Sequence, residues 1–256
     1  MGIMHKHGVF ALNISTLSPM PNTYFKFKQF TIHQDQCAMK VCTDACILGA
    51  WFAEKIPSNS SVLDIGSGTG LLMLMLAQKN KSEIDGIELD LPSFKQLKEN
   101  IHQSKWKEHL RVFPGDVRNH AFSFRYDFII VNPPFFENDL LSDIEEKNLA
   151  KHSKSLTLQE LISVIDQNLH ASGSFGILLP FHREKEFEEL ASARHFYPQE
   201  KLLVKQTPAH PYFRSIIHFS RNKVPTIMGA ELTIQEQEGK YTPDFVELLR
   251  DYYLYL

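Results

Sequence analysis

The sequence predicts an α/β fold in which a mostly parallel sheet is covered by helices on both faces. From residue 61 onward, short apolar runs alternate with segments of helical periodicity. One run, Tyr126–Val131, is apolar through its middle, which is typical of a strand covered on both faces. Another run leads through a glycine-rich turn into a Leu/Met-rich segment. Alternating strands and helices of this kind form doubly wound parallel sheets.

The elements follow in order along the chain. The expected strands of the sheet cover residues 61–66, 83–88, 110–114, 126–131, 174–179, 200–206 and 214–220. The expected helices cover 43–56, 71–78, 92–103, 157–170, 183–195 and a segment that begins near 243. Thr43 or Asp44 can cap the first helix. Thr242 followed by Pro243 marks the start of the last helix. Before the sheet, Phe25 and Phe27 alternate with Lys26 and Lys28, which predicts a half-buried strand with a cationic face.

Composition excludes several classes of protein. The chain has 27 Lys and Arg against 30 Asp and Glu, and this balance excludes a histone-like or strongly basic nucleic-acid binder. The sequence has no apolar stretch of about 18 residues, so it predicts no transmembrane helix. Cys37, Cys42 and Cys46 do not have the spacing of zinc or redox motifs, so no metal is expected. They are expected to be reduced, mostly buried thiols of a cytoplasmic protein.

The strongest local motif is a glycine turn between the first sheet strand and its helix. Asp64 precedes three glycines, Gly66, Gly68 and Gly70, which let the backbone pass close to a ligand. A dinucleotide-binding motif would need its third glycine at position 71, which is Leu71, and the Lys of a P-loop is absent. The turn instead resembles motif I of the class I S-adenosylmethionine-dependent methyltransferases.

That resemblance implies a cofactor site. Asp64 would attract the ammonium group of S-adenosylmethionine. Glu88, at the end of the second strand, would accept both ribose hydroxyls, a role that carboxylates also have in dinucleotide folds. Asp116, after the third strand, would accept a hydrogen bond from the adenine amino group, with Val117 beside it.

A second motif, Asn132-Pro133-Pro134-Phe135, follows the fourth strand, where open parallel sheets bind their ligands. The prolines fix the backbone, so the Asn132 amide oxygen and the Pro133 carbonyl can accept hydrogen bonds from one NH2 group. Two such acceptors favour a pyramidal nitrogen whose lone pair can attack the methyl group. Phe135 offers a flat face for stacking. The motif resembles that of methyltransferases acting on adenine N6 or on glutamine amides, and Asn132 would also border the cofactor.

The nature of the acceptor is less directly encoded. The cofactor fold leaves too few residues for the separate recognition domain that duplex-DNA enzymes usually carry, which favours structured RNA. Two alternatives remain: a glutamine-N5 methyltransferase acting on release factors, and a non-catalytic RNA-binding module. The glutamine methylases usually have a helical domain before the cofactor fold, whereas this chain has a strand-like Phe/Lys segment there.

The residues before the glycine turn narrow the resemblance. The segments 25–30, 37–41, 43–45 and 48–51, together with both motifs and the Tyr-rich C-terminus, resemble the bacterial tRNA-valine adenine-N6 methyltransferase family. That family methylates adenine 37, beside the anticodon. The resemblance implies a Rossmann-like class I methyltransferase fold with a seven-stranded sheet. It also implies S-adenosylmethionine as cofactor, and it puts Lys40, Thr43 and Asp44 over the cofactor or the incoming base.

The expected partner is tRNA, at its anticodon stem-loop, in the cytoplasm, with no membrane and no stable protein partner. Between residues 190 and 224 there are six Lys and Arg against one acid, Glu200, which predicts phosphate contacts that salt weakens. The candidate RNA-binding residues are Lys26, Lys28, Asp44, Lys151, His152 and Arg214. Residues 1–23 are expected to be a disordered or artificial leader. A single methyltransferase domain is expected over 24–256, with 24–56 covering a catalytic core at 57–256.

Overall fold

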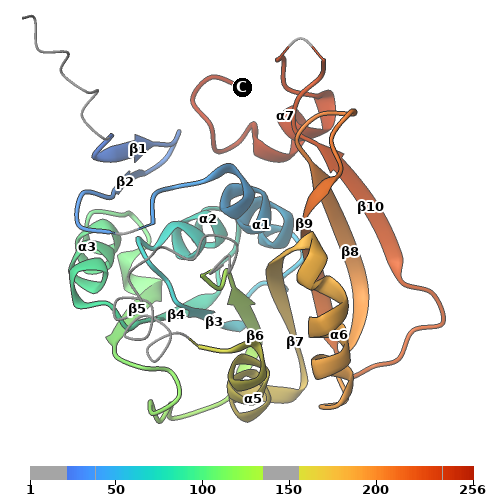
Figure 1. The fold of residues 1–256 in the computed structure, drawn as a ribbon. Coiled ribbons are helices and arrows are strands. Elements are labelled where there is room, and N and C mark those ends of the chain that lie inside the picture. Colours follow the sequence, from blue (N-terminus) through green and yellow to red (C-terminus); the bar gives the residue numbers. More distant parts are fainter. Residues whose placement is uncertain (1–21, 38, 135–155, 238) are drawn as a thin grey trace, which may run out of the picture.

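The computed structural model describes residues 22–37, 39–134, 156–237 and 239–256. Phe135, Lys151, His152 and nearly all of the expected leader lie outside these ranges. The central feature is an eight-stranded sheet with the strand order β10-β8-β9-β7-β6-β3-β4-β5 (Figure 1). β9 is antiparallel to β7 and β8, and every other neighbouring pair is parallel. The prediction of an α/β fold with a mostly parallel sheet is confirmed.

The strands are β3 (Ser61–Ile65), β4 (Glu83–Glu88), β5 (Leu110–Pro114), β6 (Tyr126–Val131), β7 (Leu169–Pro180), β8 (Tyr197–Lys205), β9 (Tyr212–Ser220) and β10 (Met228–Thr233). The predicted count of seven strands is therefore wrong by one. The additional strand is β10, which lies at the sheet edge beside β8. Its residues Gly229 and Ala230 are weak strand formers. The strand is defined by pairing with β8 rather than by its own sequence.

Helices cover the two faces of the sheet. They are α1 (Thr43–Ala53), α2 (Leu71–Lys79), α3 (Leu91–His102), α5 (Leu158–Asn168), α6 (Glu184–Ser192) and α7 (Pro243–Leu249), with 3-10 turns η1 (Lys107–His109) and η2 (Phe181–Arg183). One buried cluster joins α1, α2, α3 and α7 to the sheet, and a second joins α5 and α6 to its other face (Figure 1). Every residue of α2 from Leu71 to Ala77 is buried, which explains why this helix is apolar all round.

The predicted caps are confirmed at one helix and not at another. At α7, the Thr242 hydroxyl accepts a hydrogen bond from the Phe245 main-chain nitrogen at 3.2 Å, as expected for an N-cap. At α1, the N-cap is Cys42, and Thr43 and Asp44 already belong to the first turn. Cys37 and Cys46 are buried as predicted, whereas Cys42 is exposed, and all three are free thiols.

A short hairpin precedes α1. β1 (Tyr24–Lys26) and β2 (Thr31–His33) form a separate two-stranded sheet. Phe27, just after β1, forms an antiparallel bridge with Tyr253, and the Lys28 main-chain nitrogen donates to the Tyr252 oxygen at 2.8 Å. The hairpin is therefore held by residues far away in the sequence. No helix among the described residues is long and apolar enough to cross a membrane.

Candidate active site

The candidate site lies at the carboxyl ends of four neighbouring parallel strands, β6, β3, β4 and β5. In the strand register, Ile65 is opposite both Val131 and Ile87, and Glu88 is opposite Pro114. The residues predicted from the two motifs therefore lie together along the side of the sheet formed by the carboxyl ends of its parallel strands, which we call the site edge. This is the edge at which open α/β sheets bind their ligands.

The glycine turn leaves open space above itself. Gly66, Gly68 and Gly70 all have positive φ, at 73°, 54° and 85°. A Cβ atom at Gly66 or Gly68 would meet no atom closer than 4.0 Å, so space beside this backbone is free. At Gly70, by contrast, a Cβ atom would lie 2.8 Å from Leu97 Cδ1 of α3. The first two glycines therefore face an open space that suits a ligand, and the third allows α3 to pack closely.

Hydrogen bonds from two directions hold this turn. The main-chain nitrogens of Gly66 and Ser67 donate to the Ile87 oxygen of β4, at 3.0 and 3.1 Å. On α3, the buried Asn100 amide donates to the oxygens of Thr69 and His33, both at 2.9 Å. Asn100 thus joins the turn to β2. Our sequence analysis did not identify it, although a buried-face asparagine in an amphipathic helix is a usable signal.

Asp64 is a buried carboxyl group that is costly to ionise. Its side chain is fully buried, and within the described part of the chain neither carboxyl oxygen has a hydrogen-bond partner. The nearby Ser67 hydroxyl donates to the Asp64 main-chain oxygen, at 2.9 Å, rather than to the carboxylate. Burial raises the pKa of Asp64 to about 8, and the charge of Glu88 adds to this effect. A cationic ligand group would fit this position, because it would stabilise the ionised carboxylate.

Glu88 links the end of β4 to the glycine turn. One carboxyl oxygen accepts from the Gly68 main-chain nitrogen and the other from that of Asp90, both at 2.8 Å. Burial raises the pKa of Glu88. Each carboxyl oxygen has a second lone pair, so the group can still accept hydroxyl donors. The two contacts fix the orientation of the carboxylate beside the open space.

Asp116 has a strong partner that the sequence analysis missed. Arg118 donates to both of its carboxyl oxygens, with the closest contact at 2.6 Å, and these bonds lower the pKa of Asp116. Arg118 also reaches Glu160 of α5 at 3.1 Å. Asp116 is thus ionised and oriented by Arg118, and an adenine amino group would have to share this acceptor. Val117, which follows it, is buried.

At the end of β6, the Asn132 amide oxygen is buried and has no hydrogen-bond donor among the residues that the structure describes. Pro133 is buried beside it, whereas Pro134 is exposed. A buried acceptor without a donor is unusual, because such groups are nearly always paired in folded proteins. An amino group of an incoming substrate would satisfy it. Asp64 and Asn132 therefore form a pair of unsatisfied acceptors on adjacent strands.

The segment before α1 forms a wall beside the site. The Gln36 main-chain nitrogen donates a hydrogen bond to the Gln96 side chain of α3 at 3.1 Å. The Cys37 thiol is hydrogen-bonded to Ser93, and the charge of Glu88 contributes to raising its pKa. Lys40, which donates to the Gln34 main-chain oxygen, is also close enough to influence Cys37. The placement of Lys40 over the cofactor stays a prediction.

The other residues expected near the base have protein partners. Thr43 is hydrogen-bonded to Tyr253. Asp44 accepts from Arg214 at 2.7 Å, so the structure brings these two predicted RNA-binding residues together as an ion pair between α1 and β9. Lys26 is exposed on β1, and Lys28 donates to the Arg250 main-chain oxygen.

The basic segment at 190–224 does not form one surface. β9 runs from the site edge, where Arg214 is opposite Pro180 of β7, to the other edge, where Ser220 is opposite Ser174. Arg221 and Lys223 therefore lie away from the candidate site. Arg194 and Arg221 pair with Asp166, and Lys201 pairs with Glu184 and Glu188. The basic residues of this segment are therefore not gathered at the site edge, and the predicted phosphate contacts would fall to those that are, such as Arg214.

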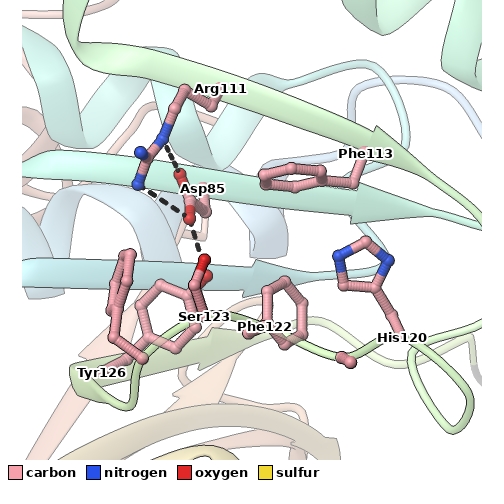
Figure 2. Close-up of a pocket in the computed structure, with 9 residues that line it drawn as sticks. Asp85, Arg111, Phe113, His120, Phe122, Ser123 and Tyr126 are labelled. Atoms are coloured by element: carbon pink, nitrogen blue, oxygen red, sulfur yellow. Dashed lines mark hydrogen bonds and ion pairs between the residues drawn. The ribbon is translucent and has the colours of Figure 1, made fainter.

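A second buried polar group lies away from the site edge. Asp85 of β4 accepts two hydrogen bonds from Arg111 and one, at 2.6 Å, from the Tyr126 hydroxyl (Figure 2). The adjoining cavity has a volume of about 80 Å³. These contacts join the amino-terminal halves of β4, β5 and β6, so we assign the group a structural role. Among the described residues, no group of His, Cys, Asp and Glu is arranged to hold a metal ion.

Comparison with known proteins agrees with this geometry. The family model "Methyltransferase small domain" matches residues 46–191. A tRNA1(Val) (adenine(37)-N6)-methyltransferase from Dyadobacter fermentans is 44% identical over 91% of this chain and 98% of its own length. One of the same name from Trichodesmium erythraeum is 37% identical over 92% and 99%.

Solved structures show the same fold. An O-methyltransferase, predicted as such, from Agrobacterium tumefaciens has a TM-score of 0.65 at 15% identity, covering 81% of this chain and 96% of that one. The methyltransferase CcbJ from Streptomyces caelestis has a TM-score of 0.53 at 12% identity, covering 71% and 93%. The fold is that of the Rossmann-like methyltransferases, and the sequence relatives span nearly the whole chain. The chain belongs to the tRNA1(Val) (adenine(37)-N6)-methyltransferase family.

Proposed function

We propose that this protein transfers a methyl group from S-adenosylmethionine to N6 of adenine 37 in tRNA1(Val). One observation carries the chemical part of the proposal. The Asp64 carboxyl group and the Asn132 amide oxygen are buried, have no donors among the described residues, and lie at the ends of adjacent strands. The reaction needs one acceptor for the cofactor ammonium and one for the substrate amino group. The tRNA specificity is supported by the names of relatives that cover nearly the full chain.

In this proposal the cofactor is held at the site edge. Asp64 binds the ammonium group, Glu88 accepts the ribose hydroxyls, and Asp116 and Val117 border the adenine. Gly66, Gly68 and Gly70 let the backbone approach the ligand, and the open space beside the first two supports this placement. Lys40 and Thr43 belong to the wall on the other side. When bound, S-adenosylmethionine supplies a methyl group on a positively charged sulfur.

The chain's own residues orient the nitrogen. Asn132 and the Pro133 carbonyl accept the two hydrogens of the adenine amino group, which directs its lone pair toward the methyl carbon. Pro134 fixes the backbone and Phe135 stacks on the base. Bound S-adenosylmethionine would supply the methyl group, and the methylated nitrogen would lose one of its protons to water. Positioning of this kind contributes to the rate because the acceptors are already in place when charge develops.

We further propose that the enzyme recognises the anticodon stem-loop and acts in the cytoplasm, where tRNA is modified. Lys26, Lys28, Asp44, Lys151, His152 and Arg214 are the proposed RNA contacts. A single methyltransferase domain over 24–256 is consistent with the contacts of Phe27 and Lys28, just after β1, with the C-terminal tail. Glutamine-N5 methylation would use the same Asn132 chemistry, but the relatives are named as tRNA enzymes.

The test is to supply labelled S-adenosylmethionine with unmodified tRNA1(Val) or with a release factor, and to digest the products. We expect N6-methyladenosine in the tRNA, and no label when adenine 37 is replaced by guanine. Methylglutamine in the release factor would overturn the proposal. Binding of tRNA with no transfer to any substrate would favour the non-catalytic alternative.

A further inference from the structure

Two aromatic side chains meet at the site edge outside the residues considered so far. Phe181 directly follows Pro180, the last residue of β7, and Tyr212 is the first residue of β9. Their ring centroids are 5.5 Å apart and their planes are inclined by 48°. β7 neighbours β6, with Ile177 opposite Val131. Phe181 therefore lies beyond the end of the strand that is next to Asn132.

Phe181 is 39% exposed, which distinguishes it from the many phenylalanines of the core. Tyr212 beside it is held in place from two sides. Lys205 Nζ lies 4.9 Å from the centre of the Tyr212 ring, and the Tyr212 hydroxyl is bonded to Glu231. Lys205 also pairs with Glu231 at 3.4 Å. We call the Phe181 and Tyr212 rings, with the Lys205 ammonium group beside them, the aromatic platform.

The chemistry of this platform suits a nucleobase. An exposed ring can stack on any base, and a nearby ammonium group favours the polyanionic backbone. Two acids of the neighbouring elements are paired, Glu186 with Arg183 at 2.6 Å and Glu231 with Lys205, so Lys205 would share its ammonium group between Glu231 and an RNA phosphate. Single-stranded loops of RNA are recognised mainly by such stacking of unpaired bases.

We propose that Phe181 and Tyr212 receive a nucleobase that flanks the target adenine. The inference rests on the proposed function, because it requires an RNA whose adenine amino group reaches Asn132. When that adenine leaves the stack of its loop, the neighbouring base loses a stacking partner. Phe181, at the end of the adjacent strand, replaces that partner and so holds the loop open.

The experiment compares wild type with Phe181→Ala and Phe181→Trp, using the anticodon stem-loop as substrate. We expect Phe181→Ala to raise the KM for RNA about tenfold with little change in kcat, because base–aromatic stacking has that magnitude. Phe181→Trp should retain the wild-type KM. Fluorescent 2-aminopurine placed on either side of adenine 37 should be quenched on binding at one of the two positions, and Phe181→Ala should remove that quenching.

Phe124→Ala is a matched control. Phe124 is 41% exposed, its ring lies 5.0 Å from that of Tyr126, and the Arg111 guanidinium lies 5.6 Å from it. It is thus another exposed phenylalanine with a tyrosine and a cation beside it, but it precedes β6, at the opposite edge. Phe124→Ala should leave the KM for RNA and the fluorescence unchanged.

The outcomes separate the two proposals. If wild type methylates the stem-loop but Phe181→Ala has an unchanged KM and unchanged quenching, the platform is not a base-binding site. If wild type methylates no tRNA, the proposed function fails instead. Phe181→Leu keeps most of the apolar volume without the ring, so it gives the same test if the alanine variant unfolds. A wild-type KM in Phe181→Leu would also overturn the stacking role.

Discussion

The carboxyl group of Asp64 is ordinary in the unfolded chain and strongly perturbed in the folded one. Burial raises its pKa from 3.8 to about 8. At a pH between these two pKa values, the Asp64 side chain is ionised in the unfolded chain and protonated in the folded protein. This group therefore lowers the free energy of unfolding as the pH rises from about 4 to 8. A ligand ammonium group beside Asp64 would reverse the preference of the folded protein for the protonated form, because it favours the ionised carboxylate.

This reversal predicts a proton release on cofactor binding. At pH 7, binding of S-adenosylmethionine should displace the proton of Asp64, and the affinity should fall as the pH is lowered below 8. Isothermal titration calorimetry in two buffers of different ionisation enthalpy measures the protons released. Asp64→Asn is the control, since any pH dependence that remains belongs to the ligand or to other groups. Equal proton release by wild type and Asp64→Asn would contradict the assignment.

The second prediction concerns the acceptor at the end of β6. Asn132→Ala removes the buried amide oxygen, which has no donor in the described part of the chain. We expect methyl transfer to slow by roughly 100-fold or more, the usual effect of losing one hydrogen-bond partner of the transition state. Single-turnover rates with labelled cofactor measure this step. Thermal unfolding and tRNA affinity should stay near wild type, and a near wild-type rate would exclude the proposed role.

At the scale of elements, the turn between β3 and α2 depends on a glycine for two reasons. Gly70 has a φ of 85°, and a Cβ atom there would lie 2.8 Å from Leu97 Cδ1. Gly70→Ala should destabilise the protein by about 1–3 kcal/mol, the range for residues held in a disfavoured conformation. It should also weaken cofactor binding, because the turn would shift. Thermal melting with and without S-adenosylmethionine measures both effects.

Gly229→Ala is the matched control for this change. Gly229 lies in β10, its φ is not in the positive range, and a Cβ atom would meet nothing within 4 Å. We expect a melting temperature equal to that of wild type or slightly higher, since alanine restricts the unfolded chain more than glycine does. If both variants lost the same stability, the conformation of Gly70 would not be the cause.

The strands that are apolar or that end in a motif residue could be predicted from sequence, and β4 and β6 agree to the residue. β10 could not, because Gly229 and Ala230 carry little strand preference and the strand depends on its partner. The same distinction holds at the site. Asp64 and Asn132 were identified by their position at the end of a strand. Arg118 and Asn100 were missed because their partners Glu160, His33 and Thr69 are distant in the sequence.

At the scale of the whole molecule, the basic residues of 190–224 are distributed over two edges of the sheet. Lys205 and Arg214 are at the site edge, and Arg221 and Lys223 are at the opposite edge. Arg214 and Arg221 are close in sequence because β9, which separates them, is only nine residues long. This closeness suggested a single RNA-binding surface. An antiparallel strand, however, carries the chain from one edge to the other. In this sheet, basic residues that are close in the sequence therefore do not form one basic surface.

This distribution predicts different effects for two lysines. Lys205→Gln should weaken tRNA binding and reduce the slope of log K against log salt by about 0.7–0.9, the value for one phosphate contact. Lys223→Gln removes the same charge at the opposite edge and should change neither quantity. Filter binding from 50 to 200 mM salt measures both variants. Equal slopes for the two would contradict an RNA path along the site edge.

The contact between the β1 hairpin and the C-terminal tail sets an order of events during synthesis. The Lys28 ammonium group and its acceptor at Arg250 are 222 residues apart in sequence, and the main-chain bond from Lys28 to Tyr252 spans a similar interval. At ribosomal rates of about 5–20 residues per second, the hairpin waits on the order of 10–40 s for its docking surface. The nascent chain can thus complete its sheet and glycine turn while Phe27 and Lys28 still lack their partners in the C-terminal tail.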